Sequence, residues 1–205
     1  MKKITLLLLV CLLSLAGHSQ TDADSVQAKK EAADKIKMDK LMSTAVYPAL
    51  NAGNRSGVIP VKDPTEIPDP TQDYKLLFEL DKINIDSLTG KVNSDLVEIA
   101  RIINLHVASG VPLKKIFPVI VVHGSGVNAV TNNEFYKEKF KTENPNIKLM
   151  NELVGLGAKF IACGQAMAFF EIKREALLPL VKVSVTAKTV FSNYQLKGYV
   201  KYDAP

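Results

Sequence analysis

Hydrophobic positions between residues 74 and 202 follow two alternating patterns. Short apolar runs, rich in β-branched and aromatic residues and bounded by glycine or charged residues, have the length of strands. Longer segments between them carry apolar residues at intervals of three and four, the spacing of a helix with one buried face. The pattern predicts strands at residues 74–80, 117–123, 158–163, 181–185 and 199–202.

The predicted helices occupy the segments between these strands. The clearest spans residues 93–110, where Leu96, Ile99 and Ile103 recur at helical spacing, an asparagine or serine can cap the start, and Gly110 ends the pattern. We expect the other helices at residues 132–141 and 147–156, immediately after Gly164, near 173–178, and at 187–197.

This alternation indicates the fold class. Strands separated by helices pair in parallel, because parallel neighbours need long crossover connections. We therefore predict a three-layer α/β/α sandwich around a five-stranded parallel sheet, with strand order 2-1-3-4-5. In that order the chain reverses direction between strands 1 and 3, and chemistry in such sheets collects at the carboxyl ends beside the reversal. Cys163 ends strand 3, so we expect its thiol at that point.

The start of the chain has the layout of a secretory signal peptide. Lys2 and Lys3 precede an apolar run, which small and polar residues follow, and cleavage after Ser19 is the expected processing step. The apolar run, roughly a dozen residues, is shorter than the about 20 that a membrane-spanning helix needs. No second run of that length follows. We predict an exported protein, periplasmic or secreted, without a membrane span.

The residues after the signal peptide read as an extension of the domain. Residues 21–45 are rich in Ala, Lys, Asp and Glu with a thin apolar stripe, which predicts a solvated and weakly packed helix. A proline-rich stretch follows, with a short strand expected at 58–61. We divide the chain into a signal peptide (1–19), an N-terminal extension (20–72) that wraps the domain or contacts a neighbouring subunit, and an α/β domain (73–205).

Composition and charge narrow the function classes. The chain has 205 residues, of which 47% are hydrophobic and 23% charged, as in an ordinary globular protein. Removal of the signal peptide takes away two lysines and lowers the formal charge from +5 to +3. The remaining lysines are interleaved with acids, as in "YKEKFKTEN", and arginines do not cluster, so we predict no nucleic-acid partner.

Export changes how the two cysteines are interpreted. Cys11 lies in the signal peptide, so the mature chain would have one thiol and no internal disulfide. Lipidation at Cys11 is the alternative, but Val10 fits poorly the small residue wanted before a lipidated cysteine. A lone cysteine in an oxidising compartment is either well buried or reactive.

Cys163 is the main candidate for chemistry. It precedes a short helix, whose free amides favour a thiolate, and Gly164 leaves room beside the sulfur for a second sulfur or a partner's backbone. The alternative is that Cys163 is a small buried hydrophobe. We take it as the candidate catalytic residue, with His123, Gly164 and Gln165 as candidate supporting residues.

His123 ends strand 2 and could act as a general base or bond to a loop backbone. In the predicted order strand 1 separates strands 2 and 3, which puts His123 about 10 Å from Cys163. Glu79 and Asp81 flank the end of strand 1, and we expect Asp81 in a turn or cap. His106 falls on the apolar face of its helix and is interpreted as a core histidine. The "HGSGVN" segment lacks the lysine of a phosphate-binding loop, and one cysteine with distant histidines is a weak metal site, so no cofactor and no metal are predicted.

Three segments together resemble the DsrE-like family of sulfur-relay proteins. These are "VVHG" at the end of strand 2, "AKFIACGQAM" at the end of strand 3, and the closing "VTAKTVFSNYQLKGYVKY"; the resemblance covers residues 74–202. It implies a three-layer α/β/α subunit that forms homo-oligomers, often trimers or hexamers. It also implies a cysteine that accepts sulfur as a persulfide, a role that falls on Cys163.

Three functions compete on this reading. The first is a sulfur-handling protein, a sulfurtransferase or sulfur carrier, in which Cys163 exchanges sulfur with donor and acceptor proteins or small thiols. The second is a non-enzymatic oligomeric binding or scaffold protein with a packed, structural Cys163. The third is a redox sensor that forms an intermolecular disulfide.

Overall fold

The computed structural model describes residues 26–83 and 90–202. It divides into two compact units, Met1–Thr44 and Ala45–Pro205, which are described separately. In the first unit residues 26–42 are helical with mostly exposed side chains, as the thin apolar stripe predicts. The proposed signal peptide lies outside the described residues.

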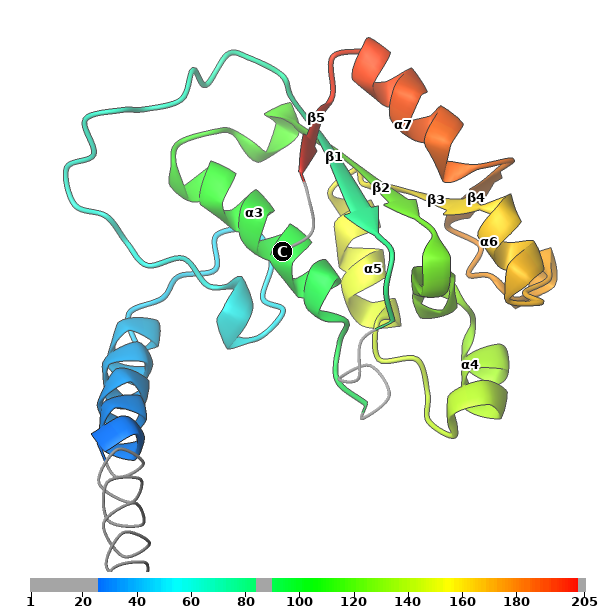
Figure 1. The fold of residues 1–205 in the computed structure, drawn as a ribbon. Helices are drawn as coiled ribbons and strands as arrows, with labels where there is room; N and C mark the ends of the chain where they lie inside the picture. The colour runs from blue at the N-terminus through cyan, green and yellow to red at the C-terminus, as the bar shows by residue number, and fades with distance from the viewer. Residues whose placement is uncertain (1–25, 84–89, 203–205) are drawn as a thin grey trace, which may run out of the picture. The chain divides into compact units, whose positions relative to one another are not determined.

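The second unit is built around one parallel sheet (Figure 1), and each of its neighbouring strand pairs runs parallel. All the predicted strands of the domain are present within two residues of their expected bounds. They are β1 (Tyr74–Leu80), β2 (Ile116–Val122), β3 (Lys159–Cys163), β4 (Val181–Ser184) and β5 (Val200–Tyr202).

The predicted helices of this unit are present except near residues 173–178, where the structure has only the 3-10 turn Arg174–Ala176. The Asn93 side chain caps the first of them by accepting from the amides of Asp95 and Leu96. The predicted strand at 58–61 is only an isolated bridge between Val46 and Val58. The α-helices of this unit are α3 (Ser94–Ala108), α4 (Asn133–Phe140), α5 (Ile147–Gly155), α6 (Gly164–Phe169) and α7 (Ala187–Leu196). The short 3-10 turns are η1 (Asn54–Ser56), η2 (Leu113–Lys115), η3 (Gly124–Val130) and η4 (Arg174–Ala176).

The strand order corrects one prediction. The fold class is the predicted α/β sandwich with five parallel strands, but the order is β4-β3-β2-β1-β5, so β2 and not β1 is the neighbour of β3. The chain moves one strand at a time from β1 to β4 and then returns to the far side of β1 as β5. The reversal therefore involves the last crossover, and Cys163 does not lie beside it. Instead Cys163 lies next to the end of β2.

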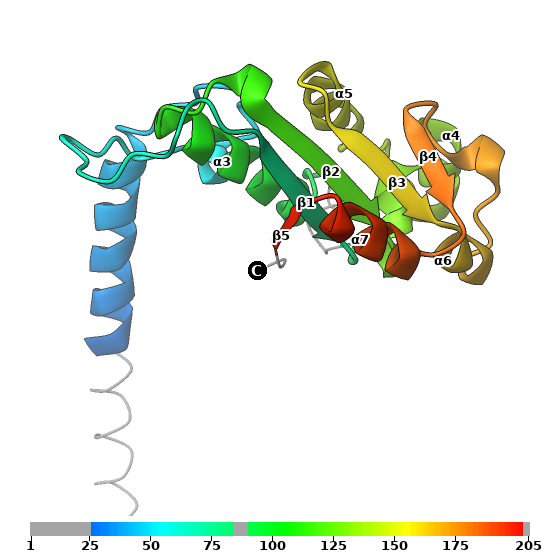
Figure 2. The ribbon, with the colours of Figure 1, turned by 90° about the horizontal axis from the view of Figure 1, so that it is seen from above.

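The path of the chain through the sheet determines which helices cover each face. Right-handed crossovers in one direction place α3 and α5 on one face of the sheet, and the returning crossover places α7 on the opposite face (Figures 1 and 2). The larger core lies between the sheet, α3 and α5, and includes Leu96, Ile103 and Phe160. The smaller core lies under α7 and consists of Leu77, Val119, Val121, Ile161, Cys163, Ala187, Val190 and Phe191.

A buried asparagine on α3 attaches the segment that precedes the sheet. The Asn104 side chain accepts from the amides of Ala49 and Leu50 and donates to the carbonyls of Leu50 and Ser56, at 2.7–2.9 Å. Leu50 itself is buried in the larger core. Residues 49–56 therefore pack on the rest of this unit.

Candidate functional site

Cys163 is the last residue of β3 and directly precedes α6. Its thiol is free, and only 5% of the residue is exposed. The residue belongs to the apolar cluster under α7, together with Val190 and Phe191. The predicted strand-end position is thus correct, while the side chain is more buried than a freely accessible nucleophile would be.

The two residues after Cys163 lie against the backbone at the end of β4. A Cβ at Gly164 would lie 2.8 Å from the carbonyl oxygen of Ser184, a contact that real side chains do not make. The amide of Gln165 donates to the carbonyl of Val185 at 3.3 Å, and its side chain is exposed. Glycine is therefore required here by the neighbouring backbone, and Gln165 presents its amide side chain to solvent.

His123 immediately follows β2 and lies closer to Cys163 than predicted. In the β2–β3 register Val122 is paired with Ala162, so His123 and Cys163 occupy the next position on adjacent strands, about 5 Å apart between Cα atoms. The His123 ring packs edge-on against Phe191 of α7, with 6.1 Å between centroids. Both residues therefore lie on the α7 face.

A carboxylate and a lysine complete this cluster. Glu79 of β1 contacts Nε2 of His123 through Oε1 at 2.6 Å and Nζ of Lys201 through Oε2 at 2.7 Å. The Lys201 ammonium also lies over the Phe191 ring, 4.9 Å from its centroid. β1, β5 and the residue after β2 thus contribute one polar group each to the same face.

The ionisation of Glu79 follows from these contacts. Burial acts to raise the pKa of Glu79, but the hydrogen bonds and charges of Lys201 and His123 outweigh it, so the pKa lies below its ordinary value. Glu79 is therefore a carboxylate near neutral pH. A carboxylate only accepts hydrogen bonds, so the Nε2 atom of His123 carries the proton between them.

The glycines after His123 serve packing. The His123 amide donates to the carbonyl of Leu80 and the Gly126 amide to that of Asp81. A Cβ at Gly126 would lie 2.4 Å from the Leu80 oxygen, and one at Gly124 2.6 Å from the Asp81 oxygen. The loop can approach the end of β1 only because these residues are glycines, which explains the "GSG" sequence and fixes the position of His123.

Sequence reasoning placed Cys163 correctly but missed the partners of His123. The sequence pattern places Glu79 at the end of strand 1 without a partner, and it does not single out Lys201 or Phe191. A signal was present: Glu79 is the one charged residue among the last five of "YKLLFEL", and Lys201 interrupts "YVKY" in the same way. His106 lies on the other side of the sheet, where its ring packs against Tyr74 with 5.6 Å between centroids.

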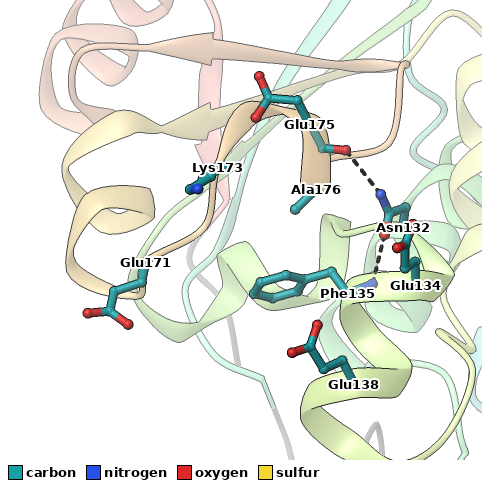
Figure 3. A pocket seen from close by; sticks show the side chains of 8 residues that line it. All are labelled: Asn132, Glu134, Phe135, Glu138, Glu171, Lys173, Glu175 and Ala176. Atoms are coloured by element: carbon teal, nitrogen blue, oxygen red, sulfur yellow. Dashed lines mark hydrogen bonds between the residues drawn. The ribbon is translucent and has the colours of Figure 1, made fainter.

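A second feature is an acidic hollow beside α4. It has a volume of about 470 Å³ and lies between the start of α4 and the η4 segment (Figure 3). Asn132 spans its edge by donating to the carbonyl of Glu175 at 3.0 Å. The other lining residues are Glu134, Phe135, Glu138, Glu171, Lys173 and Ala176.

Within residues 26–83 and 90–202, no three His, Cys, Asp or Glu side chains come close enough together to hold a metal ion. No helix in those ranges is both long enough and apolar enough to cross a membrane.

Comparisons with known proteins give one family match. The model of the DsrE/DsrF-like family matches residues 81–201, which is more than half of the chain. Among solved structures, the protein of unknown function MTH1491 from Methanobacterium thermoautotrophicum is similar, with 20% sequence identity and a TM-score of 0.47. The match covers 64% of this chain and 99% of that one. No curated protein matches significantly.

Proposed function

Because this chain belongs to the DsrE/DsrF-like family, which is associated with sulfur relay, we propose that it handles sulfur and that Cys163 is the acceptor. The Cys163 thiolate would attack a sulfane-sulfur donor, hold the sulfur as a persulfide and pass it to an acceptor thiol. The protein would then be a sulfurtransferase or a sulfur carrier.

One observation carries this proposal. Cys163 is a free thiol at the carboxyl end of a central parallel strand, the edge of such sheets where chemistry usually lies. Polar groups from β1, β5 and the residue after β2 lie on the same face. A cysteine that served only to fill the core would need none of them nearby.

We also propose where the protein acts and how it assembles. The basic start and short apolar run support export with cleavage after Ser19, and a periplasmic or secreted site of action. We expect a homo-oligomer, a trimer or hexamer, as the resemblance to the DsrE-like family implies, and the large apolar side chains exposed on the domain would be available for contacts between subunits. They include Phe169, Val185, Leu196 and Val200.

The burial of Cys163 favours a second candidate function. With only 5% of the residue exposed and an apolar cluster around it, Cys163 can be a packing residue of an oligomeric binding or scaffold protein. Such a protein would not exchange sulfur. The two candidates differ in a property that is directly measurable, the reactivity of the native thiol.

Mass spectrometry after incubation with inorganic polysulfide tests the acceptor role. We expect a mass increment of one sulfur atom, which peptide mapping assigns to Cys163 and not to Cys11. The increment should be removed by a small thiol and should be missing in Cys163→Ser. Cys163→Ala would check that the fold is intact without the thiol.

Alkylation of the native protein separates the two candidates. A sulfur acceptor should react with iodoacetamide at a rate within about tenfold of an unfolded control, while a packed thiol should react far more slowly. A thiol that alkylates rapidly but takes up no sulfur would contradict the acceptor role. Slow alkylation without sulfur uptake would support the scaffold function.

A further inference from the structure

The observed strand order gives His123 and Cys163 a common environment. Their strands are adjacent, and both side chains lie on the face covered by α7, since His123 contacts Phe191 and Cys163 shares a cluster with Phe191. At a separation of about 5 Å between Cα atoms, an imidazole and a thiol on one face are within reach of each other. This proximity follows only from the observed order of strands.

The contacts of His123 determine which ring nitrogen can accept a proton. Nε2 donates to the Glu79 carboxylate at 2.6 Å, so in a neutral ring Nδ1 has the free electron pair. Within residues 26–83 and 90–202, Nδ1 has no hydrogen-bond partner. Glu79 is itself held by Lys201 at 2.7 Å, so the carboxylate that orients the ring is fixed from both oxygens.

The Cys163 thiol is more buried than the side chains of His123 and Glu79. Cys163 is 5% exposed, whereas the side chains of His123 and Glu79 are 27% and 21% exposed. A proton leaving the thiol needs an acceptor inside the site, because water has little access to the sulfur. The partly exposed imidazole is the group that can take the proton and exchange it with solvent.

We propose that His123 is the proton acceptor for the Cys163 thiol and that Glu79 is the residue that positions and charges the imidazole for this task. The inference deepens the sulfur-acceptor proposal and rests on it for the identity of the substrate. It assigns the Glu79–His123 contact a role that a purely structural ion pair would not have.

The reaction balances without an external oxidant. The thiol proton of Cys163 moves to Nδ1 of His123, and the thiolate attacks the terminal sulfur of a hydropersulfide RSSH. A bond forms between that sulfur and Cys163 Sγ, while the S–S bond of the donor breaks and its electron pair leaves with RS⁻. The imidazolium returns its proton to RS⁻, so the net change is Cys163–SH and RSSH to Cys163–SSH and RSH.

Several elements of the described part of the chain contribute charged or polar groups near the imidazole. β1 contributes Glu79 and β5 contributes Lys201. α7 and the loop after it contribute the phenols of Tyr194 and Tyr199, which pack beside the cluster, and burial raises the pKa of Tyr199. β3 contributes the thiol itself, and Ser184 of β4, which is paired with Cys163, donates its hydroxyl to the Ala162 carbonyl. The imidazole is therefore the basic side chain on this face that can take the thiol proton.

The test compares rate profiles of the full chain and its variants. Iodoacetamide alkylation of Cys163 and sulfur uptake from glutathione persulfide are each followed from about pH 5 to 9, across the histidine range. The wild type should show an inflection in that range. His123→Gln should lose the inflection and slow both reactions at neutral pH by at least about tenfold. Glu79→Gln keeps the hydrogen-bond acceptor without the charge, and should move the inflection to lower pH.

Matched controls lie on the opposite face. His106→Gln and Glu98→Gln alter a histidine and an ion-paired glutamate of α3, and both should keep the wild-type profile. If His123→Gln does not fold, the wild-type profile and Glu79→Gln still decide, since a wild-type profile without the inflection overturns the inference.

The result separates the two proposals. Sulfur uptake with wild-type profiles in both Glu79→Gln and His123→Gln overturns the role of His123 and leaves the acceptor function intact. No sulfur uptake, combined with an alkylation profile that depends on His123, supports the proton role of the pair and refutes the acceptor function. A profile that is unchanged in the variants, with no sulfur uptake, refutes both.

Discussion

Asn104→Ala should detach the segment around residues 49–56 from α3. The side chain is completely buried and makes four hydrogen bonds to the backbone of that segment, at 2.7–2.9 Å. Alanine removes the donor and the acceptor together and leaves the amides of Ala49 and Leu50 without their partner. The segment also contributes Leu50 to the larger core, so its loss would expose apolar surface.

The expected loss of unfolding free energy follows from these four hydrogen bonds. Each backbone hydrogen bond contributes about 1 kcal/mol net, and a buried group left unpaired costs about 1–3 kcal/mol. Water can reach the half-buried Ala49 amide more easily than the buried Leu50 amide. We therefore expect Asn104→Ala to lower the free energy of unfolding by about 3 kcal/mol. Asn51→Ala, which removes one exposed contact to the Gly53 amide, is the matched control and should cost less than about 0.5 kcal/mol.

Urea unfolding gives the free energy, and amide hydrogen exchange locates the change. In Asn104→Ala the amides of Ala49 and Leu50 should exchange much faster, while those of the central strands β1 and β2 change only as global stability does. A loss below about 1 kcal/mol with unchanged exchange at Ala49 and Leu50 would refute the reasoning.

Two further predictions test the surroundings of the site. Gly126→Ala should destabilise the domain by more than about 2 kcal/mol, because its Cβ would lie 2.4 Å from the Leu80 carbonyl oxygen. The control is Gly155→Ala, which has open space around its Cβ and should be neutral or stabilising by up to about 1 kcal/mol. Thermal unfolding of the two variants compares these effects. Because the pKa of Glu79 is lowered from 4.5, its stabilising contribution should be fully present above about pH 4.5 and should disappear as pH falls through the lower, folded-state pKa. Unfolding free energies of wild type and Glu79→Gln should therefore converge in acid, and a constant difference down to pH 3 would contradict this.

Periodicity predicted the elements well because it reflects local burial. The apolar run in "YKLLFEL" and the spacing of Leu96, Ile99 and Ile103 record which side chains face a core, and a cap such as Asn93 marks where a helix begins. These features depend only on residues that are close together in the sequence. The same information placed Cys163 at the end of a strand and indicated the family.

The sequence by itself therefore determined the fold class, the strands and helices, and the strand-end position of Cys163. Only the tertiary structure decided that β2 lies between β1 and β3, that α7 buries the thiol, and that Glu79, His123 and Lys201 meet. The physical reason is that strand order depends on how helical crossovers pack on the sheet, and no local pattern records which strands become neighbours. The approach of His123 to Cys163 depends on that order.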